Sequence, residues 1–304
     1  ISKNDFLAFS QNATTSLIMS ITQPLKAKNY QIFLSSHEIH WYKSLFSKGE
    51  MPMKEVTFPN YAKLRPVPFR KNKITIIEPV RLAKDPGKVL GKRPSIVIIS
   101  HVSRLTGEIL LTSKLFREIK SLNSQNIVVA DGSQAVGAMK ISVKKLADIY
   151  IGITSKFIQA EPHIGFCWIA ADIVRYFGIK SWSISSYEFR REIYSALRSL
   201  KMVRLRKNIK SLRIAFKKVF RKNSIPILHI PHQADHLLII PSSNPNAAVH
   251  ELKKNGIIIS TNTGWSLTEP IISGLRISIS PLLKLTQIKR TTQVLAEIKK
   301  DGFI

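Results

Sequence analysis

An aspartate and a lysine in this chain each follow a short apolar run rich in Ile and Val. Asp131 comes directly after Ile127–Ala130, and Lys156 comes three residues after Ile149–Ile153. A carboxylate and a primary amine held close together suit pyridoxal phosphate, because the amine forms a Schiff base with the aldehyde and the carboxylate pairs with the protonated pyridine nitrogen. The same two residues also fit a structural Asp–Lys pair or two unrelated surface charges, and spacing alone leaves these interpretations open.

Three apolar runs separated by helical stretches would position these residues. The first run, Ile96–Ile99, is followed by a helical pattern over Leu110–Leu122, and a shorter helical stretch around Val143–Leu146 precedes the third run. The order strand, helix, strand, helix, strand predicts a parallel sheet with crossovers, and therefore an α/β fold. In such sheets, ligands bind at the carboxyl ends of the strands. Polar segments follow the three runs there: Ser100–Arg104, Asp131–Gln134 and Thr154–Lys156.

These segments also carry a family resemblance. The chain reads SHVSRLTG from Ser100, VVADGSQAVG from Val128, and ITSKF from Ile153 ahead of IGF. This order resembles class V aminotransferases, the pyridoxal-phosphate group that includes cysteine desulfurases, isopenicillin N epimerase-like proteins and kynureninases. The resemblance implies a three-layer α/β/α fold of the fold type I class, with a smaller C-terminal α+β domain. It also implies a homodimer that acts on an amino acid.

The resemblance implies a role for individual residues. Lys156 would carry pyridoxal 5'-phosphate, Asp131 would pair with the pyridine nitrogen, and Gln134 would contact the ring hydroxyl. Arg276 matches the arginine that holds the substrate α-carboxylate, which a planar guanidinium can bind with two parallel hydrogen bonds. The other implied cofactor contacts are Ala13 and Thr14 at the phosphate, Ser155 before the lysine, and His40 stacked on the ring.

Several positions depart from the family pattern. Ser155 replaces the histidine before the lysine, residues 159–163 replace a glycine-rich loop, and Arg104 stands where many relatives have Asn or Tyr. The cysteine of the desulfurases would fall close to Leu267, and none is present there. We therefore predict transamination or lyase chemistry, and not a persulfide-forming cysteine desulfurase. The alternative is a catalytically decayed relative with a binding or structural role.

Length and composition are consistent with two domains. The chain has 304 residues, of which 44% are hydrophobic, enough for a large and a small core. We predict a large pyridoxal-phosphate domain over residues 1–180, with connecting helices and a small domain over residues 181–304. The resemblance implies that family members carry several dozen residues before the position of Ile1, so the chain would be a fragment, a processed product or a shortened relative. No run reaches the roughly 18 apolar residues of a membrane span, and the single cysteine, Cys167, favours a reducing, cytoplasmic location.

The net charge of +28 would suit a nucleic-acid or anionic membrane partner. The densest basic patch, Lys201–Lys222, has apolar residues at helical spacing, which predicts an amphipathic helix with a basic, solvated face. We expect no nucleic-acid function, because no aromatic residues lie among the basic ones on that face. His229, His232 and His236 lie near one another in the sequence, but we predict no metal site, since no CxxC or HExxH spacing is present.

The remaining segments are predicted more coarsely. Residues 49–95 hold seven of the 15 prolines, which favours short strands and turns. In the C-terminal part we expect a helix over Ala247–Asn255 that ends at Gly256. Strands are expected there around Ile227–Ile230, around Leu237–Ile240 and from Ile257 to Ile259.

Overall fold

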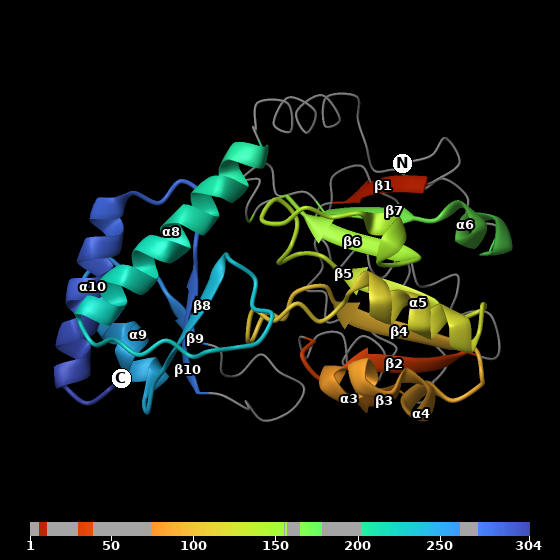
Figure 1. The fold of residues 1–304 in the computed structure, drawn as a ribbon, viewed down its shortest axis with the longest axis horizontal. Coiled ribbons are helices and arrows are strands. Elements are labelled where there is room, and N and C mark those ends of the chain that lie inside the picture. Colours follow the sequence, from red (N-terminus) through yellow and green to blue (C-terminus); the bar gives the residue numbers. More distant parts are fainter. Residues whose placement is uncertain are drawn as a thin grey trace, which may run out of the picture.

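The structure is a computed structural model that describes residues 6–10, 30–38, 74–154, 156, 165–177, 202–261 and 273–304. Within these residues the strands form two sheets, which lie in two neighbouring parts of the molecule (Figure 1). The larger sheet has the order β1 (Phe6–Ser10), β7 (Gly165–Ile169), β6 (Ile149–Ile153), β5 (Ile127–Asp131), β4 (Ser95–Ser100), β2 (Gln31–Ser35) and β3 (Ile74–Ile77).

The larger sheet is mostly parallel, as predicted. β3, β2, β4, β5 and β6 pair in parallel, whereas β7 is antiparallel to both β6 and β1. β1 therefore runs in the same direction as β6. The arrowheads of β4, β5 and β6 point toward the smaller part of the molecule (Figure 1). The carboxyl ends of these strands, where ligands bind in such folds, thus face the second sheet.

Helices cover both faces of this sheet. On one face α3 (Pro79–Lys84), α4 (Pro86–Leu90) and α5 (Ser113–Leu122) bury apolar side chains against alternate residues of the strands. On the other face α6 (Ala171–Phe177) packs Ile173 against the remaining strand residues. Each buried Leu or Ile contributes roughly 1.5–3 kcal/mol to the stability of the layers. This confirms the predicted three-layer arrangement of the α/β domain.

In the proline-rich region β3 (Ile74–Ile77) confirms one predicted strand, whereas the helices α3 and α4 correct the prediction of turns after it. Pro79 and Pro86 stand in the first turns of these helices, where a missing backbone N–H costs no intrahelical hydrogen bond. The Asp85 carboxylate accepts a hydrogen bond from the Lys88 backbone N–H at 3.0 Å and caps α4. α5 begins later than predicted because the Thr112 hydroxyl accepts from the Leu115 N–H at 3.2 Å and caps the helix there.

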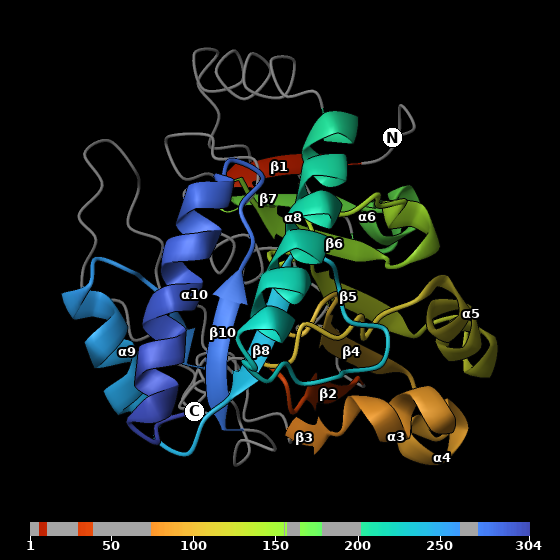
Figure 2. The same ribbon diagram turned by 60° about the vertical axis from the view of Figure 1, so that its left-hand side comes forward.

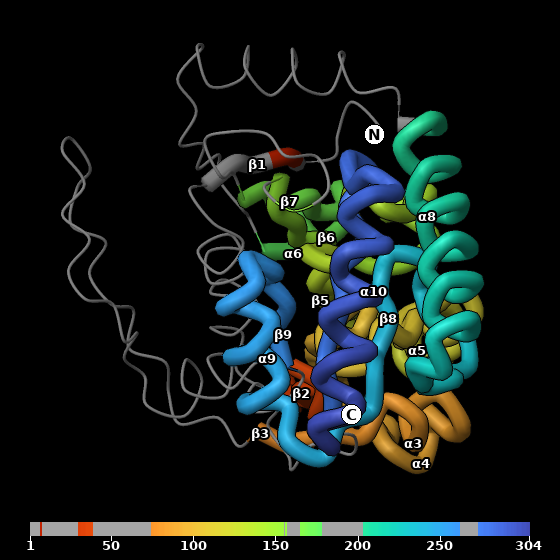
Figure 3. The backbone as a smooth tube through the Cα atoms, turned by 90° about the vertical axis from the view of Figure 1, so that its left-hand side faces the viewer, coloured from red at the N-terminus to blue at the C-terminus, as the bar shows by residue number. Residues whose placement is uncertain are grey.

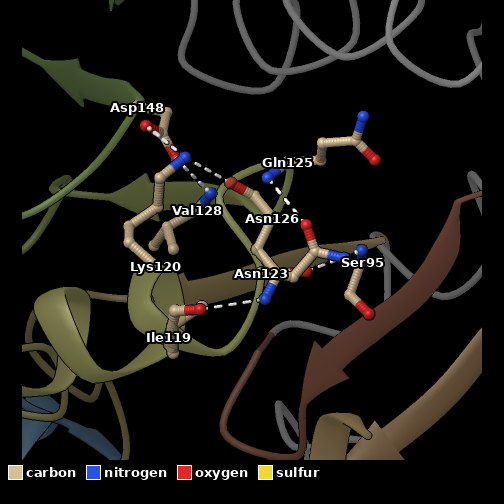
Figure 4. Close-up of polar contacts among 8 residues, drawn as sticks. All are labelled: Ser95, Ile119, Lys120, Asn123, Gln125, Asn126, Val128 and Asp148. Atoms are coloured by element: carbon tan, nitrogen blue, oxygen red, sulfur yellow. Dashed lines mark hydrogen bonds and ion pairs between the residues drawn. The ribbon is translucent and has the colours of Figure 1, made fainter. Parts of the chain in front are cut away.

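Polar side chains form a hydrogen-bonded network at the amino edge of this sheet, the edge at which the parallel strands begin (Figure 4). The Asp148 carboxylate, just before β6, accepts a hydrogen bond from the Val128 N–H at 2.8 Å and pairs with the Lys120 ammonium at 3.2 Å. The Asn126 side chain accepts from the Ser95 N–H and donates to the Ile119 carbonyl, both at 2.9 Å. Burial raises the pKa of Asp148, and the charge of Lys120 opposes the shift. This network joins β4, β5, β6 and α5 where the strands begin.

The smaller sheet is antiparallel and has the order β8 (Leu237–Pro241), β10 (Gly274–Ser278) and β9 (Ser260–Thr261) within the described residues. The helices α8 (Met202–Lys222), α9 (Pro245–Lys254) and α10 (Leu285–Lys300) lie side by side over it (Figure 3). Phe216, Phe220, Leu252 and Leu295 belong to the buried core that they form with the sheet. The α+β character predicted for the C-terminal part is therefore correct.

Two strands predicted in this part need correction. The residues Ile227–Ile230 form no strand, although the Leu228 N–H donates to the Ile239 carbonyl at 2.9 Å. One hydrogen bond is too little to add a strand to the ladder. The strand expected from Ile257 begins only at Ser260. The helix over residues 245–254 is confirmed, and Gly256, with φ +69°, provides the left-handed turn that ends it.

Helix α8 is amphipathic, as predicted, but its two faces differ from the prediction in detail. Ile209, Phe216 and Phe220 are buried, whereas Val203 at the start of the helix is 67% exposed. Arg213, expected on the solvated face, is only 8% exposed. Its guanidinium donates to the carbonyl of Ala234 at 2.8 Å and to that of Leu237 at 2.7 Å. These carbonyls compensate for the loss of water around the charge.

The two parts of the molecule are tied together by backbone hydrogen bonds. The Ala234 N–H donates to the Gly107 carbonyl at 2.8 Å, and the Ile109 N–H donates to the His232 carbonyl at 3.1 Å. Gly107 has φ +75°, and a Cβ there would lie 2.8 Å from the Cβ of Leu237, so the close approach requires glycine. The predicted division at residues 180 and 181 lies outside the described residues and stays a prediction. Across the described ranges, no helix is long and apolar enough to cross a membrane.

Candidate active site

Asp131 is the last residue of β5 and stands at the centre of the carboxyl edge. Its register partners are Ser100 on β4 and Ile151 on β6. The half-buried carboxylate accepts a hydrogen bond from the Ser133 N–H at 2.8 Å, which fixes the turn after the strand. A Cβ at the next residue, Gly132, would lie 2.2 Å from the ring of Tyr150. Glycine therefore allows the turn to pass over the tyrosine.

Lys156 follows the neighbouring strand β6 and interacts electrostatically with Asp131. Its side chain keeps exposed surface, although protein atoms surround most of it. Burial lowers the pKa of Lys156 to about 8, and the charges of Arg104 and Arg276 act in the same direction, while Asp131 opposes them. An amine with this pKa is unprotonated far more often near neutral pH than an ordinary lysine, and is therefore a better nucleophile.

Arg276 reaches this edge from the other sheet. It lies on β10, where its Nε donates to the Ser260 hydroxyl and its Nη1 donates to the Arg104 carbonyl, both at 3.1 Å. Burial lowers the pKa of Arg276 to about 10, and the nearby charge of Arg104 adds to the shift. The pKa of Arg104 is lowered by burial, and Asp131 opposes this. The structure thus brings together Asp131, Lys156 and Arg276, three of the residues predicted from the sequence, around Arg104.

Glu38 is a fifth ionisable group at this edge, and it was not among the predicted site residues. It follows β2, is only 2% exposed, and its carboxyl accepts a hydrogen bond from the Ser100 N–H. Burial and, second, the charge of Asp131 raise the pKa of Glu38 to about 8, although hydrogen bonds from Ser100 oppose the shift. Glu38 is therefore mostly protonated at neutral pH. Its place beside Asp131 follows from the pairing of β2 with β4, which no local pattern in the sequence reveals.

Two buried histidines hold the SHVSRLTG segment. The His101 Nδ1 lies 2.8 Å from the Tyr150 hydroxyl, and the His37 Nδ1 lies 3.1 Å from the Ser103 hydroxyl. The Ser103 hydroxyl also accepts from the backbone N–H groups of the second and third residues after it, both at 3.1 Å. Burial lowers the pKa of both histidines, that of His101 to about 4, so both are neutral. Their contacts fix the backbone that carries Arg104.

The other predicted residues divide into two groups. Gln134 is buried in the turn after Asp131, where its backbone interacts electrostatically with the buried ring of His236 from the smaller part. Burial lowers the pKa of His236 to about 3. The other predicted cofactor contacts, Ala13, Thr14, His40 and Ser155, lie outside the described residues. β1 nevertheless ends at Ser10 on the carboxyl edge, directly before the first two of them.

Metal ligation has no support in the described part of the chain, where no group of three or more His, Cys, Asp or Glu side chains is placed to hold an ion. Instead, the edge combines one amine of lowered pKa, one carboxylate and two guanidinium groups. The amine fits the aldehyde of pyridoxal phosphate, and the carboxylate fits its pyridine nitrogen. The surplus positive charge fits the phosphate and a substrate carboxylate.

Comparisons with known proteins agree with this chemistry. The family model for aminotransferase class-V matches residues 9–182, more than half of the chain. A NifS-like protein has a similar structure, with a TM-score of 0.72 and 15% identity over 99% of this chain and 84% of that one. Cysteine desulfurase from Thermococcus onnurineus NA1 superposes with a TM-score of 0.68 and 17% identity, covering 97% of this chain and 79% of that one.

Ureidoglycine-glyoxylate aminotransferase from Bacillus subtilis also superposes, with a TM-score of 0.68 and 11% identity over 98% of this chain and 80% of that one. At these identities the superpositions establish the fold and not the reaction. No curated protein matches the chain in sequence. The family model and the shared fold lead to the same assignment: the chain belongs to the aminotransferase class-V family, and this membership implies pyridoxal phosphate as its cofactor.

Proposed function

We propose that the protein is a pyridoxal-phosphate-dependent enzyme that acts on an amino acid through Lys156, with transamination or lyase chemistry. The observation that carries the proposal is the convergence of Asp131, Lys156 and Arg276 from two sheets onto one edge. When bound, pyridoxal phosphate accepts the electrons released as a bond at the substrate α-carbon breaks. Family members assemble this site at a subunit interface, so we also propose a homodimer.

Asp131 and the residues beside it would hold the cofactor. The Asp131 carboxylate would pair with the pyridine nitrogen and keep it protonated, and Gln134 lies in the same turn to contact the ring hydroxyl. For the phosphate we propose Ala13 and Thr14, which follow β1, together with Ser155. For the face of the ring we propose His40. These four assignments rest on the resemblance to the family.

Lys156 would attach the cofactor and then move protons at the substrate. With a pKa of about 8, its amine can both accept and release a proton near neutral pH. Arg276 would bind the substrate carboxylate, since hydrogen bonds to Ser260 and Arg104 hold its guanidinium in place. A fixed guanidinium loses little freedom on binding, so it orients the α-carbon relative to Lys156.

We propose that persulfide-forming desulfurase chemistry is not the reaction. That chemistry needs a reactive cysteine thiolate. The chain has one cysteine, Cys167, which is fully buried on β7 among Ile and Val side chains of the sheet. A thiol in such surroundings is a small core residue rather than a nucleophile.

The test is to locate the cofactor. The purified protein is incubated with pyridoxal phosphate, reduced with borohydride, digested and mapped by mass spectrometry. We expect a visible absorbance band that disappears on reduction and an adduct on Lys156, while the Lys156→Ala protein treated in parallel carries none. An adduct on another lysine, equally abundant in the variant, would overturn the proposed site.

The alternative function is a binding or structural role in a relative that has lost catalysis. One observation favours it: Arg104, which interacts with Asp131, stands where many relatives have a neutral side chain. A guanidinium there competes with the pyridine nitrogen for the carboxylate. The two functions differ in one measurement. A catalyst shows changes in the cofactor absorbance when a panel of amino acids is added, whereas a decayed relative carries the adduct and shows none.

A further inference from the structure

The segment after α8 turns back beside the helix toward the larger part of the molecule (Figure 2). Two hollows lie along α8, one with a volume of about 670 Å³ and one of about 440 Å³. Gln233 and Asp235 line both of them, so the hollows adjoin each other. We call the two together the α8 furrow. Of the described residues that we assign to the cofactor or the substrate, none lines it.

A row of basic side chains forms the α8 wall of the furrow: Arg206, Lys210, Arg213, Lys217 and Arg221. They recur every three or four residues, which places them on one face of the helix. At a rise of 1.5 Å per residue the row is roughly 22 Å long. Charges gathered along one wall create a stronger potential than the same charges spread over a surface.

Arg206 gives a second and independent indication of an anionic ligand. Its Nε is buried and has no hydrogen-bond partner in the described part of the chain. Arg213 in the same row differs, because its guanidinium donates to two carbonyls and to the Gln233 side chain. A buried guanidinium N–H without an acceptor is costly. A carboxylate or phosphate in the furrow would supply the missing acceptor at Arg206.

The chemistry of the other walls distinguishes between possible anions. Asp235 is the one acidic residue among the described residues that line the furrow, and it is paired with Arg213 at 3.9 Å. None of these lining residues is Phe, Tyr or Trp, and the rings along the furrow are the small imidazoles of His229 and His232, so it lacks the large aromatic surfaces on which single-stranded bases stack. Aliphatic side chains line the furrow instead, including Ile109, Ile227 and Ile230.

From this geometry we propose that the α8 furrow binds an acidic peptide segment of a partner protein in extended conformation. The length of the basic row corresponds to about seven residues of extended chain at roughly 3.3 Å per residue. Carboxylates of the segment would meet the basic row, and its aliphatic side chains would pack on the opposite wall. Rows of complementary charge give such an interface its specificity and a fast association rate.

Two triple variants test the proposal at equal net charge. The first, Lys210→Glu, Lys217→Glu and Arg221→Glu, reverses three charges of the furrow. The second, Arg204→Glu, Lys218→Glu and Lys222→Glu, reverses three charges of the same helix that do not line it. All six side chains are exposed, so neither variant disturbs the core. Binding of fluorescein-labelled octaglutamate is measured by anisotropy at physiological salt, with octaglutamine and oligothymidylate as comparison probes.

We expect octaglutamate to bind the unmodified protein and octaglutamine not to bind. The furrow variant should weaken the binding of octaglutamate at least about tenfold, and the control variant less than about threefold. Equal weakening in both variants would show that only the overall charge of the chain matters, and would overturn the proposal. Absence of binding at physiological salt would overturn it as well. Tighter binding of oligothymidylate, lost selectively in the furrow variant, would identify a nucleic acid as the occupant instead.

Discussion

Each edge of the larger sheet carries an aspartate and a lysine, and the two pairs differ in their surroundings. At the amino edge, Asp148 accepts from the Val128 backbone and pairs with Lys120 at 3.2 Å. Lys120 in turn donates to the Asn126 carbonyl at 2.5 Å. At the carboxyl edge, burial lowers the pKa of Lys156 to about 8, the carboxylate of Asp131 opposes this shift, and the like charges of Arg104 and Arg276 add to it.

The difference shows what separates a structural pair from a reactive one. The residue types are the same, so the sequence left both interpretations of an Asp–Lys pair open. At the amino edge the two charges compensate each other, and the backbone groups between them are hydrogen-bonded (Figure 4). At the carboxyl edge positive charge exceeds negative charge, which destabilises the protonated lysine and favours anionic ligands.

The largest expected effect is that of removing the reactive amine. Lys156→Ala should abolish covalent attachment of pyridoxal phosphate, because it removes the amine that would form the Schiff base with the aldehyde. The free energy of unfolding should change by less than about 1 kcal/mol, since the side chain keeps exposed surface and is not part of the buried core. Borohydride trapping and urea unfolding measure the two effects. Lys120→Ala is the matched control, and it should retain the adduct. Covalent attachment of pyridoxal phosphate to Lys156→Ala at the level of the unmodified protein would contradict the assignment of Asp131 and Lys156 as the reactive pair.

The next effect concerns the carboxylate of the same pair. Asp131→Asn should retain the adduct on Lys156 but slow turnover by about 10²–10³-fold, because a neutral amide cannot stabilise a protonated pyridine nitrogen. Single-turnover absorbance changes with a reactive amino acid measure the rate. The amide keeps the shape of the side chain, so the turn after β5 should persist. A rate within a few-fold of the unmodified protein would remove Asp131 from this role.

At the amino edge, Asp148→Ala should reduce the stability of the fold and leave the covalent attachment of the cofactor intact, which is the opposite of the result expected for Lys156→Ala. It removes the acceptor of the Val128 N–H and leaves Lys120 without its carboxylate, and we expect a loss of about 2–4 kcal/mol in the free energy of unfolding. The adduct on Lys156 should still form. Urea unfolding of the apoprotein measures the first quantity and borohydride trapping the second. Full stability together with a lost adduct would mean that the two edges had been assigned the wrong way round.

The last effect is a dependence of stability on pH at Glu38. Its pKa is raised from 4.5 to about 8, so between these values the folded protein holds a proton that the unfolded chain has lost. The contribution of Glu38 is therefore full below about pH 4.5 and is lost as the pH rises toward 8. Glu38→Gln lacks this dependence, and its stability relative to the unmodified apoprotein should improve as the pH rises from 5 to 8. Parallel urea-unfolding stabilities over that range would contradict the shift.

Sequence reasoning succeeded where the signal was local. The continuous β-branched runs ending at Ile99, Ala130 and Ile153 predicted three neighbouring strands, and with them the location of Asp131 and Lys156 at the carboxyl ends of two of these strands. Their roles toward a cofactor stay predictions. Such runs need burial on both faces, which a parallel sheet between helices provides. The assignments at Ala13, Thr14, His40 and Ser155 lie outside the described residues and stay predictions.

The failures involve contacts between distant parts of the chain. Glu38 lies beside Asp131 only because β2 pairs with β4, and no periodicity in the sequence reports that pairing. Arg213 was expected in solvent, because a pattern of charged residues does not reveal the carbonyls of Ala234 and Leu237 that surround it. The helices at Pro79 and Pro86 were missed because proline ends a helix in its interior but suits its first turn.

The pairing of β1 with β7 has a consequence for the order in which the protein assembles. Among the described strands, β1 (Phe6–Ser10) pairs only with β7 (Gly165–Ile169). During synthesis β1 therefore has no strand to pair with until more than 150 further residues have been added. At the usual speed of translation this delay lasts roughly 8 to 30 s. The strands that carry Asp131 and Lys156 pair locally before then. The proposed phosphate contacts at Ala13 and Thr14 follow β1. In a nascent chain the phosphate-binding part of the proposed cofactor site would therefore form after the part that contains Asp131 and Lys156.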